Sequence, residues 1–257
     1  MPITSVSLLP AAPLLLPAAS PSQPADFAAA TAELRATVDG ILRNLPAADT
    51  ALLLLPAEEA LVIDAPRASL ASYGLPDVTT KVTVDEALIA AVSARGQAPR
   101  VRSDSLTGDA AVFALLLADA RPGLALAPVT VPCRASAASA ASAAGLHGIA
   151  MGLARAVASV ERDVAVIAAG DLAATLDMTS PGYLVEGAID WDERLVAAVR
   201  AGDPLAAGDL GPEEAGRVQA RGWASTTVAL TLAQGTGWRF RDVTYLASKG
   251  VGQIVAG

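Results

Sequence analysis

The side chains of this sequence that could do chemistry at an expected ligand site are three carboxylates, Glu58, Asp109 and Asp171. Glu58 and Asp171 follow apolar runs of strand length, 51–55 and 164–169, and ligands of open α/β sheets bind beyond the carboxyl ends of such strands. Together the three carboxylates could form an oxygen-only site for Mg²⁺ or Ca²⁺. The structural alternative is that Asp171 accepts backbone N–H groups in a turn and that Glu58 lies in a solvated loop.

The sequence contains only one histidine and one cysteine, which limits the kinds of metal and catalytic site that it can form. Cys133 excludes an internal disulfide and a multi-cysteine metal site, and we interpret it as a small buried hydrophobic residue rather than a reactive thiol. His147 lies in an Ala/Gly-rich stretch, where a packed or partly exposed histidine is a better interpretation than a metal ligand or general base. We interpret Asp190, Asp192 and Glu193 as exposed charges at the start of a helix.

Composition and charge narrow the class of protein. Of 257 residues, 53% are hydrophobic and only 4% are aromatic, so we expect an aliphatic core. The net charge of -8 argues against non-specific nucleic-acid binding and against an anionic membrane surface as partners. Prolines interrupt the apolar stretch 7–20, and no run reaches the ~18 apolar residues of a membrane span. We therefore expect no targeting segment, no membrane association and a cytoplasmic protein.

Strand and helix patterns alternate along the chain. Strands are predicted over 3–9, 51–55, 61–63, 101–103, 124–131, 164–169, 240–247 and 251–256, with Pro56 ending the second strand and 61–63 pairing beside it. Helices are predicted over 25–45, 84–95, 109–120, 135–160, 185–201, 213–221 and 225–234. This alternation predicts an α/β fold, with a doubly wound, mainly parallel or mixed central sheet and helices on both faces. No linker divides the chain, so we expect a single domain over 1–257.

Short segments spread over nearly the whole chain stand in an order that indicates a family. They are 10–17 (PAAPLLLP), 55–57 (LPA), 108–111 (GDAA), 170–174 (GDLAA), 188–203 with Asp190, Asp192 and Gly202-Asp203, and Tyr245 with 250–252 (GVG). In that order they resemble the PHPP-type, SPH, DHG, GDLSH, FD…GD and Y…GVGY motifs of the class III extradiol ring-cleavage dioxygenase catalytic-subunit family, whose relatives include the Memo proteins. The resemblance implies that family's α/β fold over the whole chain.

The resemblance also implies a chemistry whose ligands this sequence lacks. In the family, two histidines and a carboxylate hold Fe(II), and a further histidine acts as acid or base. Here the motif histidine positions are all alanine, namely Ala11, Ala57, Ala110 and Ala174. An alanine methyl neither binds iron nor transfers a proton. We therefore expect no iron, no other cofactor and no ring cleavage.

The expected function is that of a divergent, non-catalytic family member, which uses the remnant cleft for binding or assembly. The four alanines should converge on that cleft, with Asp171 at its edge and Glu58 and Asp109 nearby. A cleft lined by alanine methyls favours a small aromatic or apolar ligand. Two alternatives stay open: an oxidoreductase or hydrolase with a site rebuilt from carboxylates and a hard metal, and a subunit that supports an active partner chain. The sequence leaves open whether the protein forms a homo-oligomer or a heteromeric complex.

Overall fold

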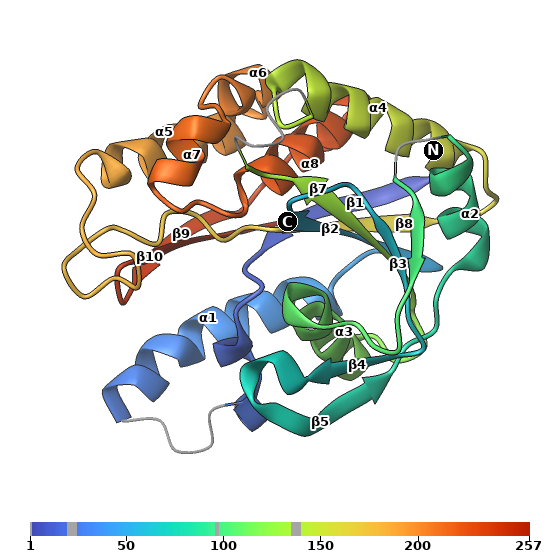
Figure 1. Cartoon of the computed structure of the whole chain (residues 1–257), viewed down its shortest axis with the longest axis horizontal. Helices are drawn as coiled ribbons and strands as arrows, with labels where there is room; N and C mark the ends of the chain where they lie inside the picture. Colours follow the sequence, from blue (N-terminus) through green and yellow to red (C-terminus); the bar gives the residue numbers. More distant parts are fainter. Residues whose placement is uncertain (1, 20–24, 96–97, 135–139) are drawn as a thin grey trace.

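A mixed eight-stranded sheet forms the centre of the computed structural model, which describes residues 2–19, 25–95, 98–134 and 140–257 (Figure 1). The strand order in this sheet is β6-β3-β7-β2-β8-β1-β10-β9. The strands are β1 (Ile3–Leu9), β2 (Thr50–Ala57), β3 (Val62–Asp64), β6 (Arg100–Arg102), β7 (Ala125–Pro132), β8 (Val164–Ala169), β9 (Val243–Ser248) and β10 (Val251–Ala256). A separate antiparallel pair consists of β4 (Arg67–Leu70) and β5 (Leu75–Lys81).

Four parallel strands, β7, β2, β8 and β1, are neighbours in the middle of the sheet and are almost entirely buried. Their continuous runs of Val, Leu, Ile and Ala are typical of strands that are covered on both faces. β10 pairs antiparallel with β1, and β3 pairs antiparallel with β7, so the sheet is mixed. The predicted α/β fold with a mainly parallel or mixed sheet is confirmed.

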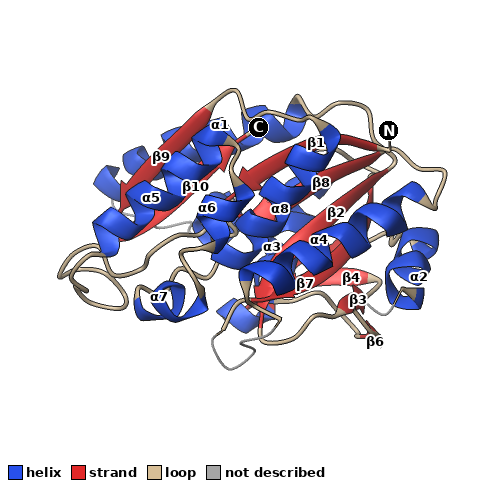
Figure 2. Cartoon of the chain, turned by 90° about the horizontal axis from the view of Figure 1, so that it is seen from above, coloured by secondary structure: helices blue, strands red, loops and turns tan. Residues whose placement is uncertain are grey.

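Helices cover both faces of this sheet (Figures 1 and 2). On one face α8 (Trp223–Thr236) packs on β1, β2 and β8, and both α4 (Ala143–Ala158) and α6 (Pro204–Gly208) pack on α8. On the other face lie α1 (Ala25–Arg43) and α3 (Gly108–Ala120), together with β4 and β5. The other α-helices are α2 (Glu86–Ala94), α5 (Ala188–Ala201) and α7 (Pro212–Arg217). Within the described ranges, no helix combines the length and the apolar character that crossing a membrane requires.

Each face of the sheet carries its own hydrophobic core. Leu52 and Leu54 of β2 pack with α4 and α8, whereas Leu53 packs with α1 and α3 on the opposite face. Successive residues of β2 therefore belong to opposite cores, as the alternation of side chains along a strand requires. Trp223 and Phe113 are fully buried, one in each core, among mostly aliphatic side chains.

The β1, β8 and β10 strands have the bounds that the sequence predicts, but β2 does not end at Pro56. It continues to Ala57 and pairs there with β7. The pairing of β2 with β8 stops at Leu54, so the missing N–H of Pro56 interrupts no hydrogen bond on that side. The predicted place of 61–63 beside β2 is also wrong, because β7 lies between β3 and β2.

Two other differences concern helix starts and polar strands. The helix predicted over 135–160 begins at Ala143, where the Ser142 side chain caps it by accepting the Gly145 N–H; residues 135–139 lie outside the described part of the chain. The strands β4 and β5 were not predicted, because the β5 sequence, LPDVTTK, is polar and largely exposed. α6 was not predicted either, although Asp203 accepts two N–H groups at its start.

Candidate functional site

The segments that follow the parallel strands meet at one edge of the sheet. They begin with Pro10 after β1, Glu58 after β2, Cys133 after β7 and Gly170 after β8. Because these strands are parallel neighbours, their carboxyl ends share that edge. Asp171, which follows β8, therefore lies at the carboxyl edge of the sheet, as its place after a predicted strand indicates.

Asp171 is half-buried at this edge and is bonded to the segment after β1. Its Oδ2 accepts the Ala11 N–H at 3.0 Å, and its backbone carbonyl accepts the Gly222 N–H at 2.7 Å. A Cβ atom on Gly222 would stand 2.5 Å from that carbonyl oxygen, so glycine is required for this approach. Burial raises the pKa of the Asp171 carboxyl to about 6, against the opposing effect of the Ala11 hydrogen bond. Asp171 therefore accepts hydrogen bonds as a turn residue does, and the pKa of its carboxyl is raised because the group is shielded from water.

The β10 strand holds the segment that follows β8. The Leu172 N–H donates to the Gly252 carbonyl at 2.9 Å, and the Gly252 N–H donates to the Ala173 carbonyl at 2.8 Å. Asp171 and Gln253 form an antiparallel bridge in the same ladder. The backbone at the candidate site is thus fixed by a strand that lies far away in sequence.

Asp192 supports this segment from α5, and the prediction that it is an exposed helix-start charge is wrong. Its side chain is fully buried, and it accepts the Ala173 N–H at 2.9 Å and the Tyr245 hydroxyl at 2.8 Å. A Cβ atom on Gly252 would lie 1.9 Å from the Asp192 Oδ2, so only glycine fits beside the carboxylate. Burial raises the pKa of Asp192 to about 6, while these two hydrogen bonds act in the other direction. Asp190, two residues earlier, is exposed as predicted.

Asp109 and Arg221 form an ion pair near Asp171. The Arg221 Nη2 lies 3.1 Å from the Asp109 Oδ2, and the Tyr73 hydroxyl lies 3.5 Å from the Asp109 Oδ1. Burial raises the pKa of Asp109, and the Arg221 charge opposes that shift. The turn that carries Arg221 is itself bonded to the segment after β8, since the Ala174 N–H donates to the Val218 carbonyl at 3.1 Å. The position of the guanidinium therefore depends on the same segment as Asp171.

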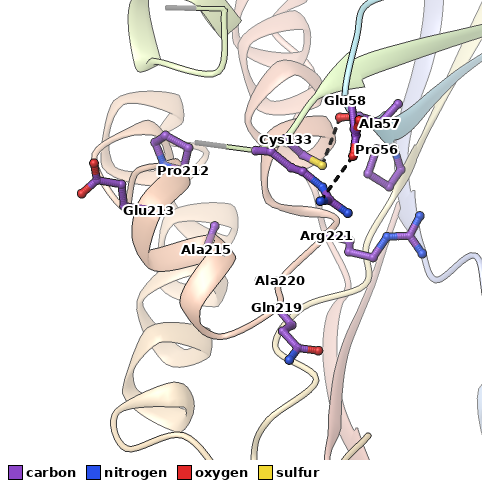
Figure 3. A pocket seen from close by; sticks show the side chains of 12 residues that line it. Pro56, Ala57, Glu58, Cys133, Pro212, Glu213, Ala215, Gln219, Ala220 and Arg221 are labelled. Atoms are coloured by element: carbon purple, nitrogen blue, oxygen red, sulfur yellow. Dashed lines mark hydrogen bonds and ion pairs between the residues drawn. The ribbon is translucent and has the colours of Figure 1, made fainter. Parts of the chain in front are cut away.

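An open cleft of about 830 Å³ lies between the ends of β2 and β7 and the α7 helix with its following turn (Figure 3). Its apolar lining consists of Pro56, Ala57, Pro212, Ala215 and Ala220. Arg134 pairs with Glu58 at 3.3 Å on the strand side, and Arg221 and Gln219 come from the turn. In Figure 3 the Glu213 side chain points away from the strand side of the cleft. The cleft thus combines apolar walls with two guanidinium groups.

The four motif alanines do not line this cleft together. Ala57 does, but Ala11 and Ala110 are buried, at 2% and 4% exposure, and the Ala174 N–H is bonded to the turn before Arg221. The convergence of the four alanine positions on one cleft stays a prediction, and of the four only Ala57 lines the cleft described here. Arg134, Arg221 and Gln219 also line the cleft, so it is more polar than the sequence predicts.

The side chains present do not fit the iron centre of the resembled family. Among the described residues, no three or more His, Cys, Asp or Glu side chains are grouped closely enough to hold a metal ion. These carboxylates do not form the alternative Mg²⁺ or Ca²⁺ site either, because Glu58 pairs with Arg134 and Asp109 pairs with Arg221. The predicted carboxylates are thus used in ion pairs and in a turn rather than assembled into one ligand set.

The single histidine lies on a helix surface, and the single cysteine lies at the cleft. His147 is exposed on α4, so of the two structural interpretations, packed or partly exposed, the packed one is wrong. Cys133 is half-buried at the cleft, and its thiol donates to the Ala57 carbonyl at 3.2 Å. Burial raises the pKa of this thiol above its ordinary value, which makes it a poor nucleophile at neutral pH.

Comparisons with known proteins bear on the fold. No family model and no curated protein matches this sequence. Among solved structures, the chain is similar to an Escherichia coli K12 protein described only as uncharacterized protein JW3007, with a TM-score of 0.57 and 14% sequence identity. The match covers 86% of this chain and 90% of the other. The likeness therefore extends over most of both chains, and it shows that they share the α/β fold.

Proposed function

We propose that this protein is a binding protein that resembles the class III extradiol dioxygenase family but does not cleave aromatic rings. In this proposal the cleft between β2, β7 and α7 binds a small organic anion with a flat apolar body, such as an aromatic carboxylate. We expect an aromatic ligand because the sequence already favours a small aromatic or apolar one. We expect it to carry a negative charge because two arginines line the cleft.

The observation that carries this proposal is the position of Arg221 at an apolar cleft. Its guanidinium has five N–H donors, and Asp109 accepts from Nη2 alone. Pro56 and Pro212 offer flat apolar surfaces on either side of the cleft. Arginine recognises carboxylates through paired N–H groups, and a planar ring gains free energy by leaving water. The absence of iron-binding side chains at the four alanine positions supports the loss of ring cleavage.

The test is a binding titration with 2-naphthoate, followed by its fluorescence, and with the neutral analogue 2-naphthalenemethanol. We expect 2-naphthoate to bind the wild-type protein, and the alcohol to bind at least roughly tenfold more weakly, because a charged hydrogen bond contributes about 1.5–3 kcal/mol. Arg221→Gln should weaken 2-naphthoate binding by a similar factor. Arg200→Gln, at an exposed arginine near the end of α5, is the matched control and should change nothing.

Two outcomes would reject the proposal. The first is equal affinity for the anion and the alcohol, which would remove the role of the guanidinium. The second is catechol-dependent oxygen uptake by the wild-type protein, measured with an oxygen electrode in the presence of ferrous iron. That result would show that the family's activity survives without the motif histidines.

One observation favours assembly with another chain as a second candidate function. Met178, Tyr183, Leu184 and Ile189 are between 53% and 71% exposed, and all lie in the segment before α5 or at its start. Exposed apolar side chains that gather in one segment are typical of interaction surfaces. Sedimentation velocity over a range of protein concentrations tests self-association, and a Tyr183→Ser, Leu184→Ser double variant should shift the protein toward the monomer. A monomer at all concentrations would leave only a heteromeric partner for this surface.

A further inference from the structure

A second cavity, of about 470 Å³, lies between α1, the loop after β1 and the β9–β10 hairpin. Its apolar lining includes Leu14, Leu34, Leu246 and Val251. The residues of this cavity are different from those of the cleft that holds Arg221, so ligand binding in the two places can be tested separately.

Gln253 gives this cavity a hydrogen-bond donor. Its side chain shares one face of β10 with those of Val251 and Val255, and Val255 belongs to the core that includes Leu34 of α1. Gln253 is only 3% exposed, and no described residue accepts a hydrogen bond from its Nε2. Its Oε1 is enclosed by protein, so the Nε2 is the polar atom that a ligand in the cavity can reach. An amide N–H without an acceptor in such a place is unfavourable, which indicates that a ligand supplies the acceptor.

Asp171, which also lines the cavity, places an acceptor beside this donor. Asp171 and Gln253 are partners in an antiparallel bridge, and the Cβ atoms of such a pair lie about 4.5–5.5 Å apart on one face of the ladder. The Asp171 Oδ2 accepts the Ala11 N–H, and a carboxylate has further lone pairs for a donor on a ligand. The polar end of the cavity is therefore one donor and one acceptor side by side.

The charged side chains of the lining favour a ligand without charge. Lys249 is positive, whereas Glu33 and Asp171 are negative. A cationic ligand would lie near the ammonium group of Lys249, and an anionic ligand would lie near the two carboxylates. Because like charges placed together are unfavourable, an uncharged group that both donates and accepts suits this cavity best.

We propose that this cavity binds a small primary amide with an apolar body. The amide oxygen accepts a hydrogen bond from the Gln253 Nε2, an amide N–H donates to the Asp171 carboxylate, and the apolar body packs on the leucines. A primary amide has its carbonyl acceptor and its N–H donors on one planar group, so it matches the adjacent donor and acceptor without bringing a charge. The proposal uses a cavity other than the anion cleft, so either can fail without the other.

The test is isothermal titration calorimetry with 2-phenylacetamide and with N,N-dimethyl-2-phenylacetamide, which keeps the carbonyl but has no N–H donor. The wild-type protein should bind the primary amide at least roughly tenfold more tightly, since hydrogen bonds to charged groups are the stronger ones. 2-Phenylethanol should also bind more weakly than the primary amide, because its single oxygen must both donate and accept. An excess of 2-naphthoate should leave the affinity for the primary amide unchanged, because the proposed anion cleft lies elsewhere.

Three variants locate the binding site. Gln253→Leu removes the donor and keeps the approximate size of the side chain, so it should weaken binding of the primary amide about fivefold. The same variant should not lower the thermal stability, because no described residue is hydrogen-bonded to the Gln253 side chain. Asp171→Asn should reduce the preference for the primary amide over the dimethyl amide. Gln234→Leu, the same substitution at an exposed position near the end of α8, is the matched control and should change nothing.

Gln253→Leu and the comparison of ligands keep the test informative even where Asp171→Asn does not fold. Circular dichroism and thermal unfolding of each variant establish that it is folded before titration. The proposal is overturned if the wild-type protein binds the dimethyl amide or 2-phenylethanol as tightly as the primary amide, or if it binds no primary amide at millimolar concentration. It is also overturned by primary-amide binding that Gln253→Leu does not weaken, or by displacement of the amide by 2-naphthoate.

Discussion

Replacing Asp192 by alanine should destabilise the protein substantially, because one buried carboxyl group accepts hydrogen bonds from two other elements. The Ala173 N–H, which donates at 2.9 Å, is buried, and leaving it unpaired costs about 2 kcal/mol. The Tyr245 hydroxyl, at 2.8 Å, belongs to a half-buried side chain that can turn to water, so its bond contributes about 1 kcal/mol. Near pH 5 we expect the free energy of unfolding to fall by about 3 kcal/mol.

The effect of Asp192→Ala should be smaller at pH 8 than at pH 5. Burial raises the folded-state pKa of Asp192 from 3.8 to about 6, so the folded protein binds a proton that the unfolded chain has released. This contribution stabilises the wild-type protein fully below about pH 4 and is lost as the pH rises through about 6. The variant has no such group, so the difference between the two proteins should narrow to about 1.5 kcal/mol at pH 8. Asp171 also has a raised pKa, but it is present in both proteins and cancels in the difference.

Urea unfolding followed by circular dichroism at the two pH values measures these differences. Tyr245→Phe should lower the free energy of unfolding by about 1 kcal/mol, since it removes one of the two bonds. Asp190→Ala is the matched control: it is the same substitution two residues away at an exposed position, and it should cost only a few tenths of a kcal/mol. A loss below about 1 kcal/mol at pH 5 for Asp192→Ala, or a loss that grows with pH, would refute the reasoning.

Three further predictions concern other parts of the site. Gly252→Ala should lower the free energy of unfolding by more than about 2 kcal/mol in the same urea assay, because its Cβ would lie 1.9 Å from the Asp192 carboxylate; unchanged stability would contradict the packing described. Cys133 should react with a disulfide reagent at pH 7.5 about tenfold more slowly than free cysteine, because burial raises its pKa, and an equal rate would contradict this. The purified protein should contain no stoichiometric iron by mass spectrometry, and the Ala11→His, Ala57→His variant should show no catechol-dependent oxygen uptake, because the remaining ligand and the acid/base group must also be placed within about 0.5 Å. Uptake by that variant would mean that the rest of an iron site is intact.

The fold was largely predictable because the strands of the parallel sheet are buried on both faces and carry uninterrupted apolar runs. Val164–Ala169 is such a run, and its bounds in the structure are those predicted. The antiparallel pair β4–β5 was not predictable in this way, because its residues are too polar to show a buried periodicity. The end of β2 was missed because Pro56 is tolerated wherever the neighbouring strand has already stopped, which depends on β8 and not on the local sequence.

The candidate site was only partly predictable, because its contacts join residues that are far apart in the chain. The position of Asp171 follows from one strand, but the pairing of Asp109 with Arg221 spans 112 residues and no local pattern indicates it. For Asp192 a signal did exist. It stands four residues after Ala188 and three before Leu195, both buried, and therefore falls on the apolar stripe of α5. A charged residue on such a stripe indicates a buried polar contact rather than solvent.

The pairing of β10 with the segment after β8 has a consequence for how the protein is made. Gln253 is synthesised roughly 80 residues after its partner Asp171, which at translation rates of about 5–20 residues per second is a delay of roughly 4–16 seconds. The parallel strands β1, β2, β7 and β8 all precede that point, so the nascent chain can assemble the middle of the sheet first. During the delay the segment after β8 lacks its backbone hydrogen bonds to β10. Asp192 is likewise synthesised before Tyr245, which donates a hydrogen bond to it in the folded protein. The segment that follows β8 therefore receives its last backbone hydrogen bonds only when the β9–β10 hairpin docks.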